Sequence, residues 1–135
     1  MDNLTKEIHA LEEEVIQLRR DFHMHPELGY KEYRTSKIVY DYLKDLGLEV
    51  KKIAKTGVVG ILRGKEPGKT VMLRADMDAL PQKEDTGLPY ASVNDGVMHA
   101  CGHDGHVAML LVAAKVLANH RDEIRGNIKF VFQPN

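Results

Sequence analysis

Hydrophobic residues near the start of the chain recur every three or four positions, with charged residues between them. The residues that share this spacing are Leu4, Ile8, Leu11, Val15, Leu18 and Phe22. Such a period predicts an amphipathic helix over residues 4–22 with one buried stripe. The stripe could also be a coiled-coil seam, but it lasts only about three heptads, so we expect it to pack on a sheet.

A second helical pattern follows the loop "HMHPELGY" (23–30). Its apolar and aromatic positions are Tyr33, Ile38, Val39, Tyr42, Leu43 and Leu46. Gly47 comes directly after the last of them, where a glycine often ends a helix because it accepts a positive φ. We therefore expect a helix over residues 33–46.

The period then changes to the short β-branched runs typical of strands. Three such runs are "LEVKKIA" (48–54), "GVVGILRG" (57–64) and "KTVMLRADMDAL" (69–80). Between the last two, Pro67 and Gly68 suit the central positions of a type II turn, which predicts a β-hairpin from about Val58 to Met77. The final segment, "NIKFVFQPN" (127–135), alternates as a further strand and halts at Pro134.

Between these strands, the pattern predicts a loop followed by a helix. The segment from Gln82 to Val97 has little period and several turn formers, so we expect an ordered loop over a site. The helix is expected to begin near Asp104, whose side chain can cap free backbone N–H groups, and to continue to about Ala118. Its buried face comprises Val107, Leu110, Leu111, Ala114 and Leu117. Strands and helices in a chain of 135 residues predict one compact α/β domain.

Composition and charge narrow the classes of partner. The 19 Lys and Arg residues against 20 Asp and Glu residues give a formal charge of −1 with no basic block, so we expect no nucleic-acid partner. The longest apolar run, "VAMLLVAA", has eight residues, far fewer than the roughly 20 that span a bilayer, so we expect no membrane partner. A lone cysteine and the lack of a signal segment favour a cytoplasmic protein.

The stretch "HACGHDGH" (99–106) concentrates the candidate chemistry. It holds the single cysteine, Cys101, together with His99, His103, Asp104 and His106. On an extended segment, side chains two positions apart point the same way, so Cys101 and His103 could reach one divalent ion. A helix N-terminus also favours the thiolate, which is the form that binds metal. Taken alone, Cys101 could instead be a small core residue, but so many polar groups beside an apolar helix are costly unless something pairs with them.

Asp76 and Asp78 form a second polar group at the end of a predicted strand, on one face by the two-residue period. Carboxylates at the carboxyl end of a strand often line the ligand crevice of an α/β sheet. An aspartate beside a metal-bound histidine would orient the imidazole. The alternative is a solvated strand end with turn-forming aspartates.

The loop 23–30 is the third candidate, with His23, His25 and Glu27. These residues could supply metal ligands. Pro26 and Gly29 indicate a turn, however, and a loop between two helices needs polar groups for caps and turns, so we favour a structural role.

Several motifs together resemble a known family of metal-dependent amidohydrolases. They are "RRDFHMHPELGYKE", "TGVVGILRG", "LRADMDALP", "HACGHDGHVAMLLVAA" and "IKFVFQPN". Their order and spacing are similar to those of hippurate hydrolase, N-acetyl-diaminopimelate deacetylase, auxin-conjugate hydrolases and related aminoacylases and carboxypeptidases. The resemblance implies a zinc-peptidase-like α/β/α sandwich with a mixed sheet, of which residues 1–135 form the N-terminal part. It also implies two divalent ions, zinc or manganese and in some members cobalt or nickel, and hydrolysis of the amide bond of an N-acyl amino acid or small peptide.

The same resemblance implies roles for individual residues. Cys101 and His103 match metal ligands, with Cys101 bridging the two ions. Asp78, as a catalytic carboxylate beside the ligands, and Asp76 match the strand motif. Asp104 and His106 match residues that surround the site and touch its ligands.

In this family, two glutamates that serve as general base and metal ligand follow the "QPN" strand. The resemblance therefore places the base, further histidine ligands, the rest of the catalytic domain and a dimerisation domain beyond Asn135. It implies a homodimer or higher homo-oligomer for the whole protein. A chain of residues 1–135 is then expected to be inactive alone.

Two other functions fit the same residues. A thiol hydrolase would use Cys101 as nucleophile and His99 or His103 as base. A non-catalytic metal-binding or interaction module would keep the fold without the chemistry.

Overall fold

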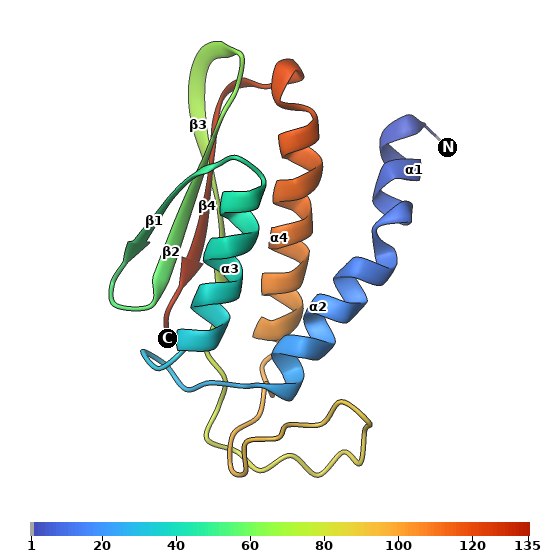
Figure 1. The fold of residues 1–135 in the computed structure, drawn as a ribbon, viewed down its shortest axis with the longest axis vertical. Helices are drawn as coiled ribbons and strands as arrows, with labels where there is room; N and C mark the ends of the chain where they lie inside the picture. Colours follow the sequence, from blue (N-terminus) through green and yellow to red (C-terminus); the bar gives the residue numbers. More distant parts are fainter. Residues whose placement is uncertain (1) are drawn as a thin grey trace.

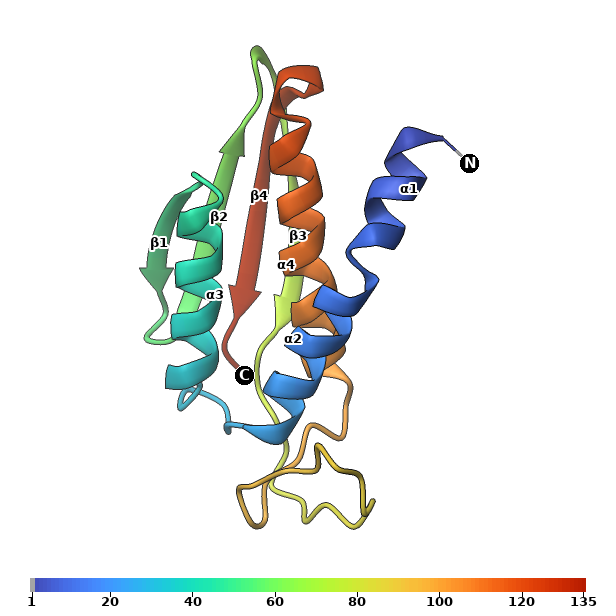
Figure 2. The ribbon, with the colours of Figure 1, turned by 45° about the vertical axis from the view of Figure 1, so that its right-hand side comes forward.

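The computed structural model describes residues 2–135 as a four-stranded mixed sheet with helices on one face (Figure 1 and Figure 2). The helices are α1 (Asn3–Ala10), α2 (Glu12–Met24), α3 (Tyr33–Asp45), α4 (His103–Asn119) and the short 3-10 helix η1 (Arg121–Glu123). The strands are β1 (Glu49–Ile53), β2 (Gly57–Arg63), β3 (Glu66–Asp76) and β4 (Arg125–Gln133). The α/β class is confirmed, and the described residues supply one of the two helical layers of the expected sandwich.

The hydrophobic core lies between the sheet and the helices α3 and α4. Phe130 and Phe132 point into it from β4, which has a strand on each side, and both are fully buried. The remaining buried members of the core are Phe22, Val39, Leu43, Leu48, Val58, Leu62, Ala75, Met77, Val107, Leu110, Leu111 and Ala114. No helix in residues 2–135 is long and apolar enough to cross a bilayer.

Helix α3 ends where the sequence predicts. Gly47 adopts φ +81°, a value that glycine reaches without steric cost. The N–H of Gly47 donates to the carbonyl of Lys44 (2.9 Å), and the N–H of Leu48 donates to that of Leu43 (3.3 Å). This pair of bonds is the Schellman arrangement, which satisfies carbonyls left free at a helix end.

The predicted hairpin between residues 58 and 77 is wrong. The strand order is β1-β2-β4-β3, so β4 lies between the two strands that the hairpin would have joined. Strand β4 runs antiparallel to β2 and parallel to β3. Directly after β2, the N–H of Gly64 donates to the carbonyl of Gly126 near the start of β4 (2.8 Å). The insertion of β4 between β2 and β3 buries Phe130 and Phe132 at the centre of the core. The free energy gained by this burial outweighs the local preference of Pro67 and Gly68 for a tight turn.

The hairpin that does form joins β1 and β2. Its turn contains Ala54 and Lys55, both with positive φ (47° and 71°). Neither residue type signals such a turn, which is why the sequence pattern does not reveal it.

Strand β3 forms an edge of the sheet, since β4 is its only neighbour. Residues 66–74 of this strand are all exposed. They include the apolar side chains of Val71 and Met72, whose exposed fractions are 57% and 61%.

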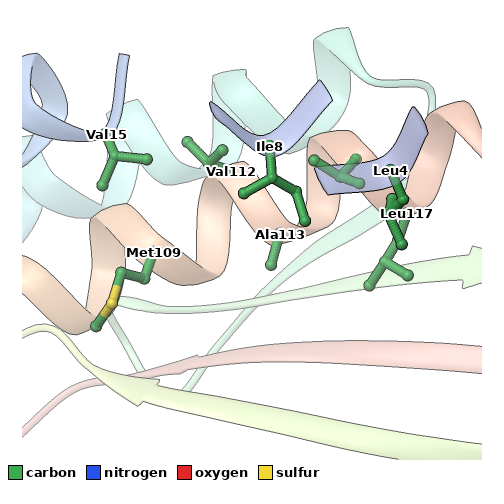
Figure 3. Close-up of a pocket in the computed structure, with 8 residues that line it drawn as sticks. Leu4, Ile8, Val15, Met109, Val112, Ala113 and Leu117 are labelled. Atoms are coloured by element: carbon green, nitrogen blue, oxygen red, sulfur yellow. The ribbon is translucent and has the colours of Figure 1, made fainter. Parts of the chain in front are cut away.

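The predicted N-terminal helix over residues 4–22 is divided in two, with a break at Leu11 (φ −99°, ψ 4°). The prediction that it packs on a sheet is wrong, because α2 packs along α4 (Figure 1). Phe22 is the only stripe residue that is fully buried. Leu4 and Ile8 of α1 remain about half exposed and face α4 across an apolar groove of about 370 Å³ (Figure 3).

A cluster of polar side chains joins α1 to the C-terminal end of α4. The ring of His120 contacts Glu7 through Nε2 (2.7 Å) and Glu123 through Nδ1, and Asn119 donates to Glu7 (3.0 Å). Hydrogen bonds from His120 to Glu7 and then to Glu123 raise the pKa of His120 above 6.5. The bonds from His120 and Asn119 lower the pKa of Glu7 below 4.5.

We expect the docking of α1 to weaken as the pH rises through the raised pKa of His120. A group whose pKa is raised by folding contributes its full stabilisation below the unfolded value and loses it above the folded one. Protection factors of α1 backbone amides in hydrogen exchange should therefore be higher below pH 6.5 than above the His120 pKa. His120→Gln should remove this difference, whereas His9→Gln, an exposed residue of α1, should preserve it. Equal protection of α1 in the unmodified chain at both pH values would contradict the prediction.

Candidate functional site

The candidate site residues gather where β3 ends and α4 begins (Figure 2). Asp76 closes β3, Asp78 follows it, and His103 is the first residue of α4. The backbone bridge between Leu80 and Met98 brings the two ends of the long connecting segment together. The fold therefore joins two motifs that lie about 25 residues apart in the sequence.

His103 and Asp78 form the best-defined contact of the site. Nδ1 of His103 lies 2.9 Å from Oδ1 of Asp78 and 3.0 Å from its backbone carbonyl oxygen. Both oxygens are acceptors, so Nδ1 carries the proton and donates it to Asp78. In the neutral imidazole, Nε2 then keeps a lone pair, in the arrangement by which a carboxylate orients a metal-binding imidazole. Asp76 lies further away, with Oδ2 at 3.9 Å from Nε2 and Oδ1 paired with Arg74 at 2.7 Å.

Cys101 is exposed, so its thiol is accessible. The prediction that residues 101–103 are extended is wrong, because Gly102 adopts a left-handed conformation (φ 83°, ψ 12°) at the start of α4. The relative directions of Cys101 and His103 are therefore set by a turn that favours glycine, not by strand periodicity. An exposed thiol two positions before an imidazole still offers the soft and borderline donors that zinc and similar ions prefer.

Asp104 does not cap α4, contrary to prediction. Gly102 occupies the cap position and offers no side-chain bond. The carboxylate of Asp104 is instead buried, and its Oδ2 lies 2.8 Å from Nδ1 of His23 and 3.0 Å from Nε of Arg19. Asp104 thus connects the start of α4 to α2.

Glu84 of the long loop completes this buried cluster. Its carboxylate lies 3.0 Å from Nε2 of His23 and also accepts from the hydroxyl of Thr86 and the N–H of Ser92. Burial alone would raise the pKa of Glu84, but the bonds from Thr86, Ser92 and His23 outweigh it and lower the pKa. Sequence reasoning missed Glu84, which lies in the long loop outside the quoted motifs, and Arg19, which begins the motif "RRDFHMHPELGYKE" but received no role of its own.

The other histidines differ in their surroundings. His99 is buried, neither ring nitrogen has a partner in the described structure, and burial lowers its pKa to about 4 against the opposing effect of Asp104. His99 is therefore neutral at pH 7. His106 is exposed on α4, with its ring centroid 6.2 Å from that of His103. The ring of His25, directly after α2, contacts Asp21 of that helix.

Glu27 has the structural role that the sequence favours. Its carboxylate accepts from the N–H groups of Arg34 (2.9 Å) and Thr35 (2.7 Å) and from the hydroxyl of Thr35 (2.7 Å). These are free donors in the first turn of α3. Glu27 therefore caps α3 from outside the helix.

The described residues include some of the ligands that a metal site needs, but not a complete set. Within residues 2–135, no group of three or more His, Cys, Asp or Glu side chains is placed to hold a metal ion. The thiol of Cys101 and Nε2 of His103 are suitable donors, but a catalytic zinc usually takes about three protein ligands. Further ligands would have to come from elsewhere.

The sequence of the chain is similar to those of known proteins. Residues 72–135 match the model of peptidase family M20/M25/M40. The chain is 52% identical over 136 aligned positions to thermostable carboxypeptidase 1 of Saccharolobus solfataricus, covering 99% of this chain and 35% of that protein. It is 47% identical over 133 positions to the N-acyl-L-amino acid amidohydrolase of Geobacillus stearothermophilus, covering 98% of this chain and 36% of that protein.

A solved structure shares the fold. A Bacillus subtilis protein, described as a dinuclear metal-binding peptidase of the M20 family, superimposes with a TM-score of 0.89 at 43% identity, covering 93% of this chain and 36% of the other. The chain spans about a third of the length of the curated relatives that it matches. Residues 72–135, which include both candidate ligands and both strand-end aspartates, thus match the model of peptidase family M20/M25/M40, and the chain as a whole adopts a fold found in a member of that family.

Proposed function

We propose that the protein is a metal-dependent hydrolase that cleaves the amide bond of N-acyl amino acids or small peptides. The observation that carries this proposal is the contact of His103 with Asp78, which engages Nδ1 and leaves Nε2 for a metal ion, two positions after the exposed Cys101. The names of the carboxypeptidase and the amidohydrolase supply the substrate class.

Two divalent ions, zinc or manganese with cobalt or nickel as substitutes, are the proposed cofactors. Cys101 and His103 would hold them, and the M20 relative described as dinuclear supports the number. Such ions polarise a scissile carbonyl and activate water for attack.

The residues of this chain prepare the site for that chemistry. Asp78 keeps the proton on Nδ1 of His103, so that Nε2 is the atom that would bind the metal ion. Arg74 holds one oxygen of Asp76 at 2.7 Å, which leaves Oδ2 directed toward His103. Asp104 anchors the start of α4 to α2. The general base and the remaining ligands are proposed to lie beyond Asn135, together with the rest of the catalytic domain and a dimerisation domain.

The thiol-hydrolase alternative gains no support from the geometry. In the described part of the chain, no hydrogen bond joins the thiol of Cys101 to an imidazole, and Nδ1 of His103 is engaged by Asp78. Chelation by EDTA should stop a metal-dependent enzyme and added metal should restore it. Inactivation by iodoacetamide without any effect of EDTA would favour the thiol enzyme instead.

The proposal is tested by comparing residues 1–135 with the protein made from its complete coding sequence. We expect the complete protein to hydrolyse benzoyl- or acetyl-amino acids in a metal-dependent manner. We expect no turnover by residues 1–135, because the two donors cannot complete a metal site and no general base is assigned among them. Metal-dependent turnover by the short chain would overturn the second expectation. A complete protein that binds metal without hydrolysing any of these substrates would favour the non-catalytic module.

A further inference from the structure

The segment Phe22–Leu28, at the end of α2, contacts the other segments that surround the candidate site. The carbonyl of Met24 accepts from the N–H of Val93 in the long loop (2.9 Å). The carbonyl of Glu27 accepts from the N–H of Ala79, directly after Asp78 (2.8 Å). The end of α2 therefore connects the long loop to the end of β3.

His23 makes the central contact of this segment. Its ring is 3% exposed and lies between two carboxylates, with Nδ1 2.8 Å from Asp104 and Nε2 3.0 Å from Glu84. The side chains of Asp104 and Glu84 are at least as completely buried, at 1% and 3%. When both carboxylates are ionised their oxygens only accept, so both ring nitrogens donate and the two hydrogen bonds are charge-assisted. The edge of the Tyr90 ring packs on the same imidazole, 5.8 Å between centroids.

The position of Asp104 decides where the candidate ligands lie. Asp104 directly follows His103 in the first turn of α4, and Cys101 is separated from that turn by Gly102 alone. No side chain caps α4 at Gly102, so the contacts of Asp104 with α2, together with that of His103 with Asp78, hold the start of the helix. Of its two partners, Arg19 is 37% exposed, whereas His23 is buried.

We propose that His23 is a positioning residue for the candidate metal centre, which it serves by fixing Asp104 and Glu84 and thereby the segment that carries Cys101 and His103. This inference rests on the proposed function, since it assumes that these two residues bind metal. His23 itself touches neither metal nor substrate. It sets the distance between the start of α4 and the long loop.

The test measures Co²⁺ binding to the complete protein through the thiolate-to-cobalt absorption band. The variant His23→Gln removes the second charge-assisted bond, and His25→Gln is the matched control in the same segment. We expect His23→Gln to raise the Kd for Co²⁺ about tenfold or more and to alter the band, as loss of groups that orient ligands does. His25→Gln should leave both unchanged. Titrations are made where circular dichroism shows each variant to be folded, so that a purely structural role would not change the Kd.

Three outcomes separate this inference from the proposed function. A Kd and band unchanged in His23→Gln overturn the positioning role and leave the metal site standing. Absence of the thiolate band in the unmodified protein overturns both. If His23→Gln does not fold, Glu84→Gln tests the inference instead. This variant weakens the contact between His23 and the long loop but keeps the contact between His23 and Asp104. An increased Kd in that variant supports the inference, and an unchanged one overturns it.

Discussion

Replacing Cys101 with serine is expected to remove most of the bound metal from the complete protein while leaving its fold intact. A serine hydroxyl is a far poorer ligand than a thiolate, which is the form of cysteine that binds metal. If Cys101 bridges two ions, as the family resemblance implies, one substitution weakens both sites. Cys101 is exposed, so its replacement should change the free energy of unfolding by no more than about 0.5 kcal/mol.

The measurement is the number of metal ions per chain by mass spectrometry, together with thermal unfolding of the metal-free protein. Ala100→Ser is the matched control, because it introduces the same hydroxyl at the neighbouring exposed position. We expect the control to keep its full metal content. An unchanged metal content in Cys101→Ser would argue against this residue as a ligand.

The second large effect concerns the core. Phe130→Ala is expected to destabilise residues 1–135 by about 3–5 kcal/mol, because it leaves a cavity at a fully buried position between β2 and β3. Native domains have a free energy of unfolding of only about 5–15 kcal/mol, so this substitution removes a large part of it. The measurement is the free energy of unfolding from urea denaturation.

Val71→Ala is the control for this experiment. It removes apolar atoms from the exposed edge strand β3, where 57% of the residue is accessible, and should change stability by about 0.5 kcal/mol or less. A loss below about 1 kcal/mol in Phe130→Ala would mean that the side chain is not packed as described.

Local signals were sufficient for much of the fold. The period of residues 33–46 and the glycine after them predict α3 and its end, since a helix end depends on bonds within a few residues. The runs of β-branched residues predict each strand, because the preference of such side chains for an extended backbone is also local. The pairing of strands was not predictable, because the turn chemistry at Pro67 and Gly68 is local whereas the insertion of β4 depends on where α4 delivers the chain.

The candidate site likewise has parts that depend on local sequence and parts that depend on long-range contacts. "CGHDGH" and "RADMDALP" are short motifs, and the contact of His103 with Asp78 agrees with the orienting role expected of an aspartate beside the site. His23, Asp104 and Glu84 meet only because three distant segments fold together, and no spacing along the chain links them. The position of Asp104 near a helix start predicts a cap. The burial of its side chain could not be predicted from that position.

The uncovered edge of β3 has a practical consequence for anyone who produces residues 1–135. A long strand with free N–H and C=O groups along one side and apolar side chains in the open is a template for another chain to pair with. Purified residues 1–135 will therefore tend to aggregate through this edge as their concentration rises. A lysine at the exposed position of Met72 would oppose such growth, as charges on natural edge strands do.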